Sequence, residues 1–122
     1  MFLAEVDVFR QALRITFSQN VEPDEADRCL ESLRQLLEGM RPGFRLLTDL
    51  SRVESMSVSC APYIGRIMDL CNQKGVESIV RVLPPEANKD IGYAILSRFH
   101  YGPDVSIVTC DNLEEAMRLL GE

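Results

Sequence analysis

Hydrophobic residues recur along the chain with two different periods, and the period switches several times. Residues 3–9 alternate weakly, and residues 12–18 alternate more clearly, with Leu13, Ile15 and Phe17 on one side. A period of two is typical of a strand that buries one face. We therefore expect two N-terminal strands, which either pair with each other or leave the first as a ragged edge strand.

A helical period follows. Pro23 suits the first position of a helix, where its missing N–H needs no partner, and Asp24 and Glu25 favour the positive end of the helix dipole. Apolar residues then recur at helical spacing, which predicts a stripe that faces the core. The stripe consists of Ala26, Cys29, Leu30, Leu33, Leu36, Leu37 and Met40. The segment 39–43, with its glycines and Pro42, ends this helix.

The segment SRVESMSVSCAP, residues 51–62, is polar and rich in serine, and it predicts a loop. Ser59 is the expected cap of the next helix, because Pro62 is tolerated only in a first turn. Lys74 and Gly75 close that helix as a basic last turn and a C-cap glycine. Its apolar stripe consists of Cys60, Ile64, Ile67, Met68 and Cys71.

The remaining chain continues to alternate strands with helices. Short apolar runs predict strands at 44–50, 76–83 and 104–109. A shorter helix is expected at 88–99. Asp111 and Glu114 form a capping box for a last helix, whose stripe is Leu113, Ala116, Met117 and Leu120.

This order of elements requires mostly right-handed crossovers, which give a parallel-type sheet covered by helices. An N-terminal hairpin makes the sheet mixed. The sequence thus predicts a single α/β domain over residues 1–122, with about four helices packed against a mixed sheet.

Charge and composition exclude several classes of partner. The formal net charge is -6 over 122 residues. A negative field repels phosphate backbones and anionic lipids, so we expect neither nucleic acid nor a membrane surface as partner. The N-terminus carries acidic residues where a signal peptide is basic, and no run approaches the roughly 20 apolar residues of a membrane span. We therefore expect a cytoplasmic protein without a membrane span.

The residues that carry chemistry are few. The four cysteines form no CxxC pair and His100 is the single histidine, so we expect no zinc or other metal site. Cysteines on apolar stripes indicate inert core thiols in a reducing compartment; only Cys60, near a helix N-terminus, has an alternative as a thiol of lowered pKa. Asp49 and His100 have no local catalytic partner, and Asp49 is expected to hold the following loop by hydrogen bonds. No phosphate-binding loop occurs. We expect no catalytic residue, no cofactor and no enzyme activity.

The element order and three motifs resemble the STAS domain family, whose best-known members are the SpoIIAA-like anti-sigma-factor antagonists. The family strand that ends in D-L-S-x-V is matched within LLTDLSRVE, and the C-terminal DNLEEAMRLL is similar to the family's last helix. The family's D-S-S-G loop aligns with residues 57–60. Val58 then stands at the phosphorylatable serine, and Cys60 stands at the glycine.

The resemblance implies a STAS/SpoIIAA-like fold and a non-enzymatic regulatory domain of bacterial signalling that binds a partner protein, such as an anti-sigma factor or a kinase-like protein. The contacts it implies are Ser55, Ser57, Val58, Ser59, Cys60 and Tyr63. From the residues alone, an ordinary capped loop is the favoured reading of the serines; with the resemblance, partner contact is favoured equally. An alternative function is a lipid or small-molecule sensing domain, with an apolar ligand between sheet and helices. Since Val58 has no hydroxyl, we expect no phosphoserine switch and no stoichiometric phosphate on Ser57 or Ser59.

Overall fold

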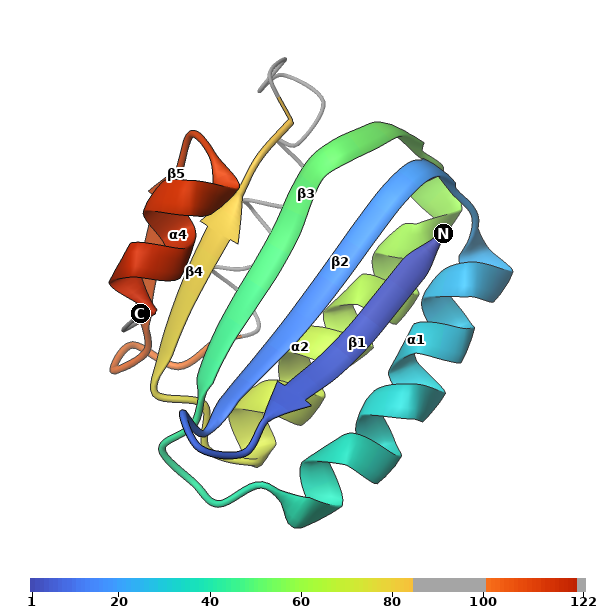
Figure 1. The fold of residues 1–122 in the computed structure, drawn as a ribbon. Coiled ribbons are helices and arrows are strands. Elements are labelled where there is room, and N and C mark those ends of the chain that lie inside the picture. Colours follow the sequence, from blue (N-terminus) through green and yellow to red (C-terminus); the bar gives the residue numbers. More distant parts are fainter. Residues whose placement is uncertain (85–100, 121–122) are drawn as a thin grey trace.

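A five-stranded mixed sheet forms the centre of the molecule (Figure 1). The computed structural model describes residues 1–84 and 101–120. The strands are β1 (Phe2–Asp7), β2 (Ala12–Val21), β3 (Arg45–Met56), β4 (Ser78–Val82) and β5 (Ser106–Cys110), in this order across the sheet. β1 pairs antiparallel with β2, and the later pairs are parallel. The predicted mixed sheet with an N-terminal hairpin is therefore confirmed, and β1 lies at its edge.

Helices cover both faces of the sheet. α1 (Pro23–Leu36) and α2 (Ala61–Gln73) lie on one face, and α4 (Leu113–Leu119) lies on the other (Figure 1). Short 3-10 turns follow α1 at Leu37–Gly39 and precede α2 at Val58–Cys60. The described residues thus contain three α-helices. The helix expected at 88–99, and His100, lie outside the described residues.

The predicted apolar stripes form the core. Leu33, Leu37, Ile64 and Ile67 are all buried, as the helical period requires. Together with Phe17 and other residues of the sheet they fill the layer between the sheet and the helices α1 and α2. A smaller cluster lies on the α4 side of the sheet, and its buried members are Ala12, Leu47, Val80, Val82, Cys110, Ala116 and Leu120. The periodicity therefore predicted correctly which helical faces are buried.

The loop expected from residue 51 onward was wrong for its first half. β3 continues to Met56, because it pairs with a second strand that is also longer than predicted. Arg52 lies opposite Ser18 and Met56 opposite Val21, with two register shifts along the pair. Backbone pairing with β2 accommodates polar residues whose side chains point to solvent, so the irregular segment shrinks to residues 57–60.

Two predicted helix caps were also displaced. The side chain that caps the turn before α2 is Ser57, not Ser59, and the cap of α4 is Asn112, not Asp111. The Asn112 side-chain oxygen accepts a hydrogen bond from the backbone N–H of Glu115 at 2.8 Å. All of these residue types make good caps, so only the path of the chain decides which one is used.

Candidate partner-binding surface

The turn at residues 57–60 joins the end of β3 to the start of α2, and it is held from several sides. The backbone N–H of Ser57 donates to the carbonyl oxygen of Val21 at 3.1 Å, and the Cys60 N–H donates to Ser57 O at 2.9 Å. The Cys60 thiol also points to Val21 O, at 3.4 Å. The Ser59 N–H donates to Ser57 Oγ at 3.3 Å. These bonds fix the turn against the last residue of β2.

The fixed turn presents an apolar side chain to solvent. Val58 is 90% exposed, although its neighbour Cys60 is fully buried. Ser59 is exposed beside it, while Ser57 is only half-buried because its oxygen caps the turn. A rigid turn that exposes a valine gives a partner an apolar contact whose conformation is already set.

The flanks of this turn are polar. Ser55, at the end of β3, is exposed and donates its hydroxyl to Asn20 Oδ1 at 2.7 Å. Tyr63 lies in the first turn of α2, half-buried, and the Arg66 guanidinium lies 5.5 Å from the centre of its ring. Arg66 was not foreseen from the sequence, since no motif marks an arginine that covers a tyrosine from the next helical turn.

Cys60 does not belong to this surface, because its side chain lies in the core. Burial raises the pKa of its thiol, and the nearby carboxylates of Glu22, Glu25 and Asp24 raise it further, against a smaller lowering by a backbone hydrogen bond at Ser57. The alternative was a Cys60 thiol whose pKa is lowered by the helix N-terminus. It is contradicted, because the pKa is raised. The remaining expected contacts lie at or near the surface, and whether they bind a partner stays a prediction.

The same carboxylates give the surroundings of Val58 a negative charge. Glu22 and Asp24 are exposed at the start of α1, and their charge reaches Cys60, two residues from Val58. Asp24 forms an ion pair with Arg28 at 3.0 Å, so Glu22 is the less compensated of the two. In the sequence Asp24 indicated only a favourable helix start, and Glu22 was not singled out. Their position beside the turn depends on how α1 packs.

The other residues that could carry chemistry are Asp49, which is held by hydrogen bonds, and the buried cysteines, whose thiol pKa is raised. Asp49 is buried, and its Oδ1 accepts hydrogen bonds from the Ser51 N–H at 3.0 Å and the Ser51 hydroxyl at 2.7 Å. It thus holds the chain that follows, as expected. Burial raises the pKa of Cys29 and of Cys71 to about 12. Within residues 1–84 and 101–120, no group of His, Cys, Asp and Glu is arranged to hold a metal ion.

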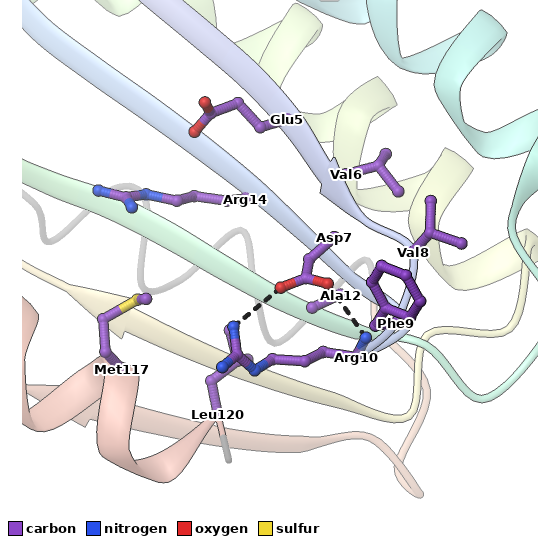
Figure 2. A pocket seen from close by; sticks show the side chains of 10 residues that line it. All are labelled: Glu5, Val6, Asp7, Val8, Phe9, Arg10, Ala12, Arg14, Met117 and Leu120. Atoms are coloured by element: carbon purple, nitrogen blue, oxygen red, sulfur yellow. Dashed lines mark hydrogen bonds and ion pairs between the residues drawn. The ribbon is translucent and has the colours of Figure 1, made fainter. Parts of the chain in front are cut away.

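An open hollow of about 470 Å³ lies elsewhere, between the β1–β2 hairpin and α4 (Figure 2). Its lining surface is mainly apolar, although it includes charged residues, of which Asp7 forms an ion pair with Arg10 at 2.9 Å. The Arg45 guanidinium connects the hairpin to the end of α4 by donating hydrogen bonds to the carbonyl oxygens of Arg10, at 2.8 Å, and of Leu120. The hollow lies on the face opposite α1 and α2. The alternative of an apolar ligand held between the sheet and the helices stays a prediction.

Solved structures with a similar backbone include the following three. An uncharacterized protein of the DUF3478 family from Shewanella loihica PV-4, described as having a SpoIIAA-like fold, is 12% identical with a TM-score of 0.72, over 98% of this chain and 93% of that one. The unphosphorylated anti-sigma factor antagonist SpoIIAA is 16% identical with a TM-score of 0.62, and both chains are covered completely, at 100%. The chain has a SpoIIAA-like fold.

A third similar structure comes from a complex. It is the diguanylate cyclase SiaD with its activator SiaC from Pseudomonas aeruginosa, where the match is 13% identical with a TM-score of 0.59 and covers 90% of this chain and 93% of that one. No family model and no curated protein sequence matches the chain. At such low identity the structural likeness shows the fold alone, and it confirms the SpoIIAA-like fold that the sequence motifs predicted. No helix within the described residues is long and apolar enough to cross a membrane.

Proposed function

We propose that this domain is a non-enzymatic regulator that binds a partner protein through the turn at residues 57–60 and the start of α2. The observation that carries the proposal is the 90% exposure of Val58 on a turn that hydrogen bonds hold in place. Covering an exposed valine contributes about 1.5–3 kcal/mol. Because the turn is already ordered, little of that gain is lost in fixing the backbone.

The structural neighbours support a role in protein binding. SpoIIAA is an anti-sigma factor antagonist, and SiaC activates a diguanylate cyclase with which it forms a complex. We extend this to a partner of the anti-sigma-factor or kinase-like class in a bacterial cytoplasm. The four cysteines, all within the described residues, are free, which supports a reducing compartment.

The absence of catalysis is part of the proposal. It is supported by the engagement of Asp49 with Ser51 and by thiols whose pKa is raised, since a nucleophile needs an accessible group in its reactive form. A Cys60 thiol that is alkylated much faster than the other three would contradict it.

The proposal is tested by replacing Val58 with a charged residue. Wild-type protein, Val58→Glu and Val108→Glu are used in parallel to capture proteins from the native source, and each captured protein is then purified and titrated directly. Val108 is also an exposed valine, at 41%, but it lies in β5. A glutamate in place of a contact that a partner buries weakens binding by roughly tenfold or more.

The expected result is one partner protein that binds the wild type and Val108→Glu but binds Val58→Glu much more weakly, at unchanged melting temperature. A partner that binds all three equally would show that another surface is used. Equal loss of folding and binding in Val58→Glu would mean that the turn has a structural role only.

A further inference from the structure

β1 is the most exposed strand of the sheet. None of its residues is buried, whereas the other edge strand, β5, contains the buried Cys110. Phe2, Ala4 and Val6 face the main core but remain only partly covered there. On the opposite face Leu3 is 53% exposed, and the hairpin turn exposes Val8 and Phe9, the latter completely at 100% (Figure 2).

The hydrogen bonds of β1 show which of its backbone groups lack a partner strand. Met1 and Ser18 exchange both of their hydrogen bonds, at 2.8 and 2.9 Å. In an antiparallel pair such exchanging positions alternate with positions that point outward. The register from Phe2–Phe17 to Asp7–Ala12 has no irregularity, so Leu3 and Glu5 bond to β2. The N–H and C=O groups of Phe2, Ala4 and Val6 therefore point away from the sheet, where no described segment pairs with them.

We propose that two copies of this chain pair through β1, antiparallel about a two-fold axis at Ala4, to form one continuous sheet. In this register Ala4 exchanges both hydrogen bonds with Ala4 of the second copy. Phe2 does the same with Val6. Each outward-pointing group of these residues then has a partner.

The side chains favour this register over the one centred on Glu5. Shifting the axis by one residue, to Glu5, places the two Glu5 carboxylates directly opposite each other, and like charges in that position are unfavourable. With the axis at Ala4, Glu5 lies opposite Leu3 of the second copy. On the core face Phe2 lies opposite Val6, so two partly exposed apolar side chains cover each other.

A second copy fits this edge better than an unrelated strand. The edge requires a strand with apolar residues at every second position and small bulk at the centre, and the sequence of β1 itself has this pattern. β1 carries the acidic Glu5 and Asp7, but it lacks the lysine, proline or bulge by which edge strands most often avoid such pairing. A two-fold contact uses the same strand of both copies, so assembly ends at the dimer. A contact between two different edges could instead continue to further copies.

The dimer is expected to be weak and sensitive to salt. One short strand and its hairpin bury less than the roughly 1,200 Å² of a stable interface. Each copy also carries a formal charge of -6, so the copies repel each other at low ionic strength. Association is therefore expected at high protein concentration and is expected to strengthen as salt screens the repulsion.

Sedimentation equilibrium and amide hydrogen exchange, each over a concentration series, test the proposal on the intact chain. We expect a monomer–dimer equilibrium in which the amides of Phe2, Ala4 and Val6 exchange more slowly as the dimer forms. The amides of Leu3 and Glu5 are already bonded to β2 and should change little. A monomer at every concentration and salt, growth beyond the dimer, or a dimer with unprotected Ala4 amides would overturn the proposal.

Two substitutions at Leu3 form a matched pair. Leu3→Glu faces Glu5 of the second copy and should weaken the dimer several-fold to roughly tenfold, whereas Leu3→Lys faces the same carboxylate and should strengthen it. Ala4→Pro removes an outward N–H without breaking a bond to β2, so it should abolish the dimer and leave the fold intact. Should Ala4→Pro fail to fold, the comparison of Leu3→Glu with Leu3→Lys still tests the proposed dimer. Equal effects of glutamate and lysine at position 3 would mean that the copies meet elsewhere.

Discussion

The hydroxyl oxygen of Ser57 accepts a hydrogen bond from the backbone N–H of Ser59 at 3.3 Å. The two serines that flank Val58 therefore have different roles. Ser57 is half-buried and caps the turn, while Ser59 is exposed and contributes only its backbone. Ser57 therefore stabilises the turn, and Ser59 is the serine that a partner or a kinase can reach.

Replacing each serine by alanine separates the roles. Ser57→Ala removes the acceptor for an N–H at the start of a turn, and we expect it to lower the free energy of unfolding by about 0.5–2 kcal/mol. Ser59→Ala removes an exposed hydroxyl and should change it by less than about 0.5 kcal/mol. Urea denaturation measures both. If Ser59→Ala is the more damaging variant, the assignment of the cap is wrong.

The sequence was sufficient for the elements whose formation depends on periodicity. The stripes of α1 and α2 repeat at helical spacing over many residues, so Leu33 and Ile67 were correctly expected in the core. The second half of β3 gave no such signal, because Arg52 and Ser55 are polar and their strand conformation depends on pairing with β2. Interactions between distant segments are not encoded in a local pattern.

The surface around Val58 was predictable in position but not in detail. A serine-rich segment before a helix indicated the turn, yet Ser55, Ser57 and Ser59 are equally good caps by residue type. Glu22 belongs to another part of the chain, and it comes near the turn only because Val21 binds Ser57 and Cys60. A surface formed by two distant segments cannot be assembled from either one alone.

Phosphorylation of the turn is expected to be absent. Val58 has no hydroxyl, the Ser57 oxygen is engaged, and a phosphate on Ser59 would add nearly two negative charges near Glu22 and Asp24. Ser59 is the accessible hydroxyl, so this prediction concerns it most. Mass spectrometry of protein from native cells should show no stoichiometric phosphate on Ser57 or Ser59. Substantial phosphate on either, removed by a dedicated phosphatase, would contradict this prediction and indicate a phosphoserine switch.

The four cysteines should react slowly while the protein is folded. All are buried, and burial raises the pKa of each thiol, so little thiolate is present at neutral pH. Iodoacetamide at pH 8 is expected to label all four at comparable, slow rates, and to label them rapidly in denaturant. Rapid labelling of Cys60 alone would contradict this prediction and, with it, the proposed absence of catalysis.

The same thiols predict a loss of stability at alkaline pH. The pKa values of Cys29 and Cys71 rise from the ordinary 9.0 to about 12 on folding. Between these values the unfolded chain loses protons that the folded chain keeps, so the free energy of unfolding falls as pH rises above 9.0. Denaturation at a series of pH values should show a shallower decline in a Cys29→Ala, Cys71→Ala double variant. An identical decline would assign the effect to other groups.

Gly75 offers a test of how α2 is connected to the loop that follows α1. Its φ is +91°, and an added Cβ would lie 2.9 Å from Cβ and 3.1 Å from Cα of Pro42. Its carbonyl oxygen accepts a hydrogen bond from the Gly43 N–H at 2.7 Å, so the two segments cannot separate without breaking that bond. Left-handed backbone strain and the close contact act together in Gly75→Ala, which we expect to lower the free energy of unfolding by about 1–3 kcal/mol.

Gly39→Ala is the matched control, since a Cβ there meets no atom within 4 Å and no left-handed φ is required. By restricting the unfolded chain, it should be neutral or stabilise the fold by up to about 1 kcal/mol. Urea denaturation of both variants gives the comparison, and equal stability of the two would show that Pro42 moves aside. A large loss in Gly75→Ala alone would show that the left-handed backbone and the close approach of Pro42 together require glycine at the end of α2.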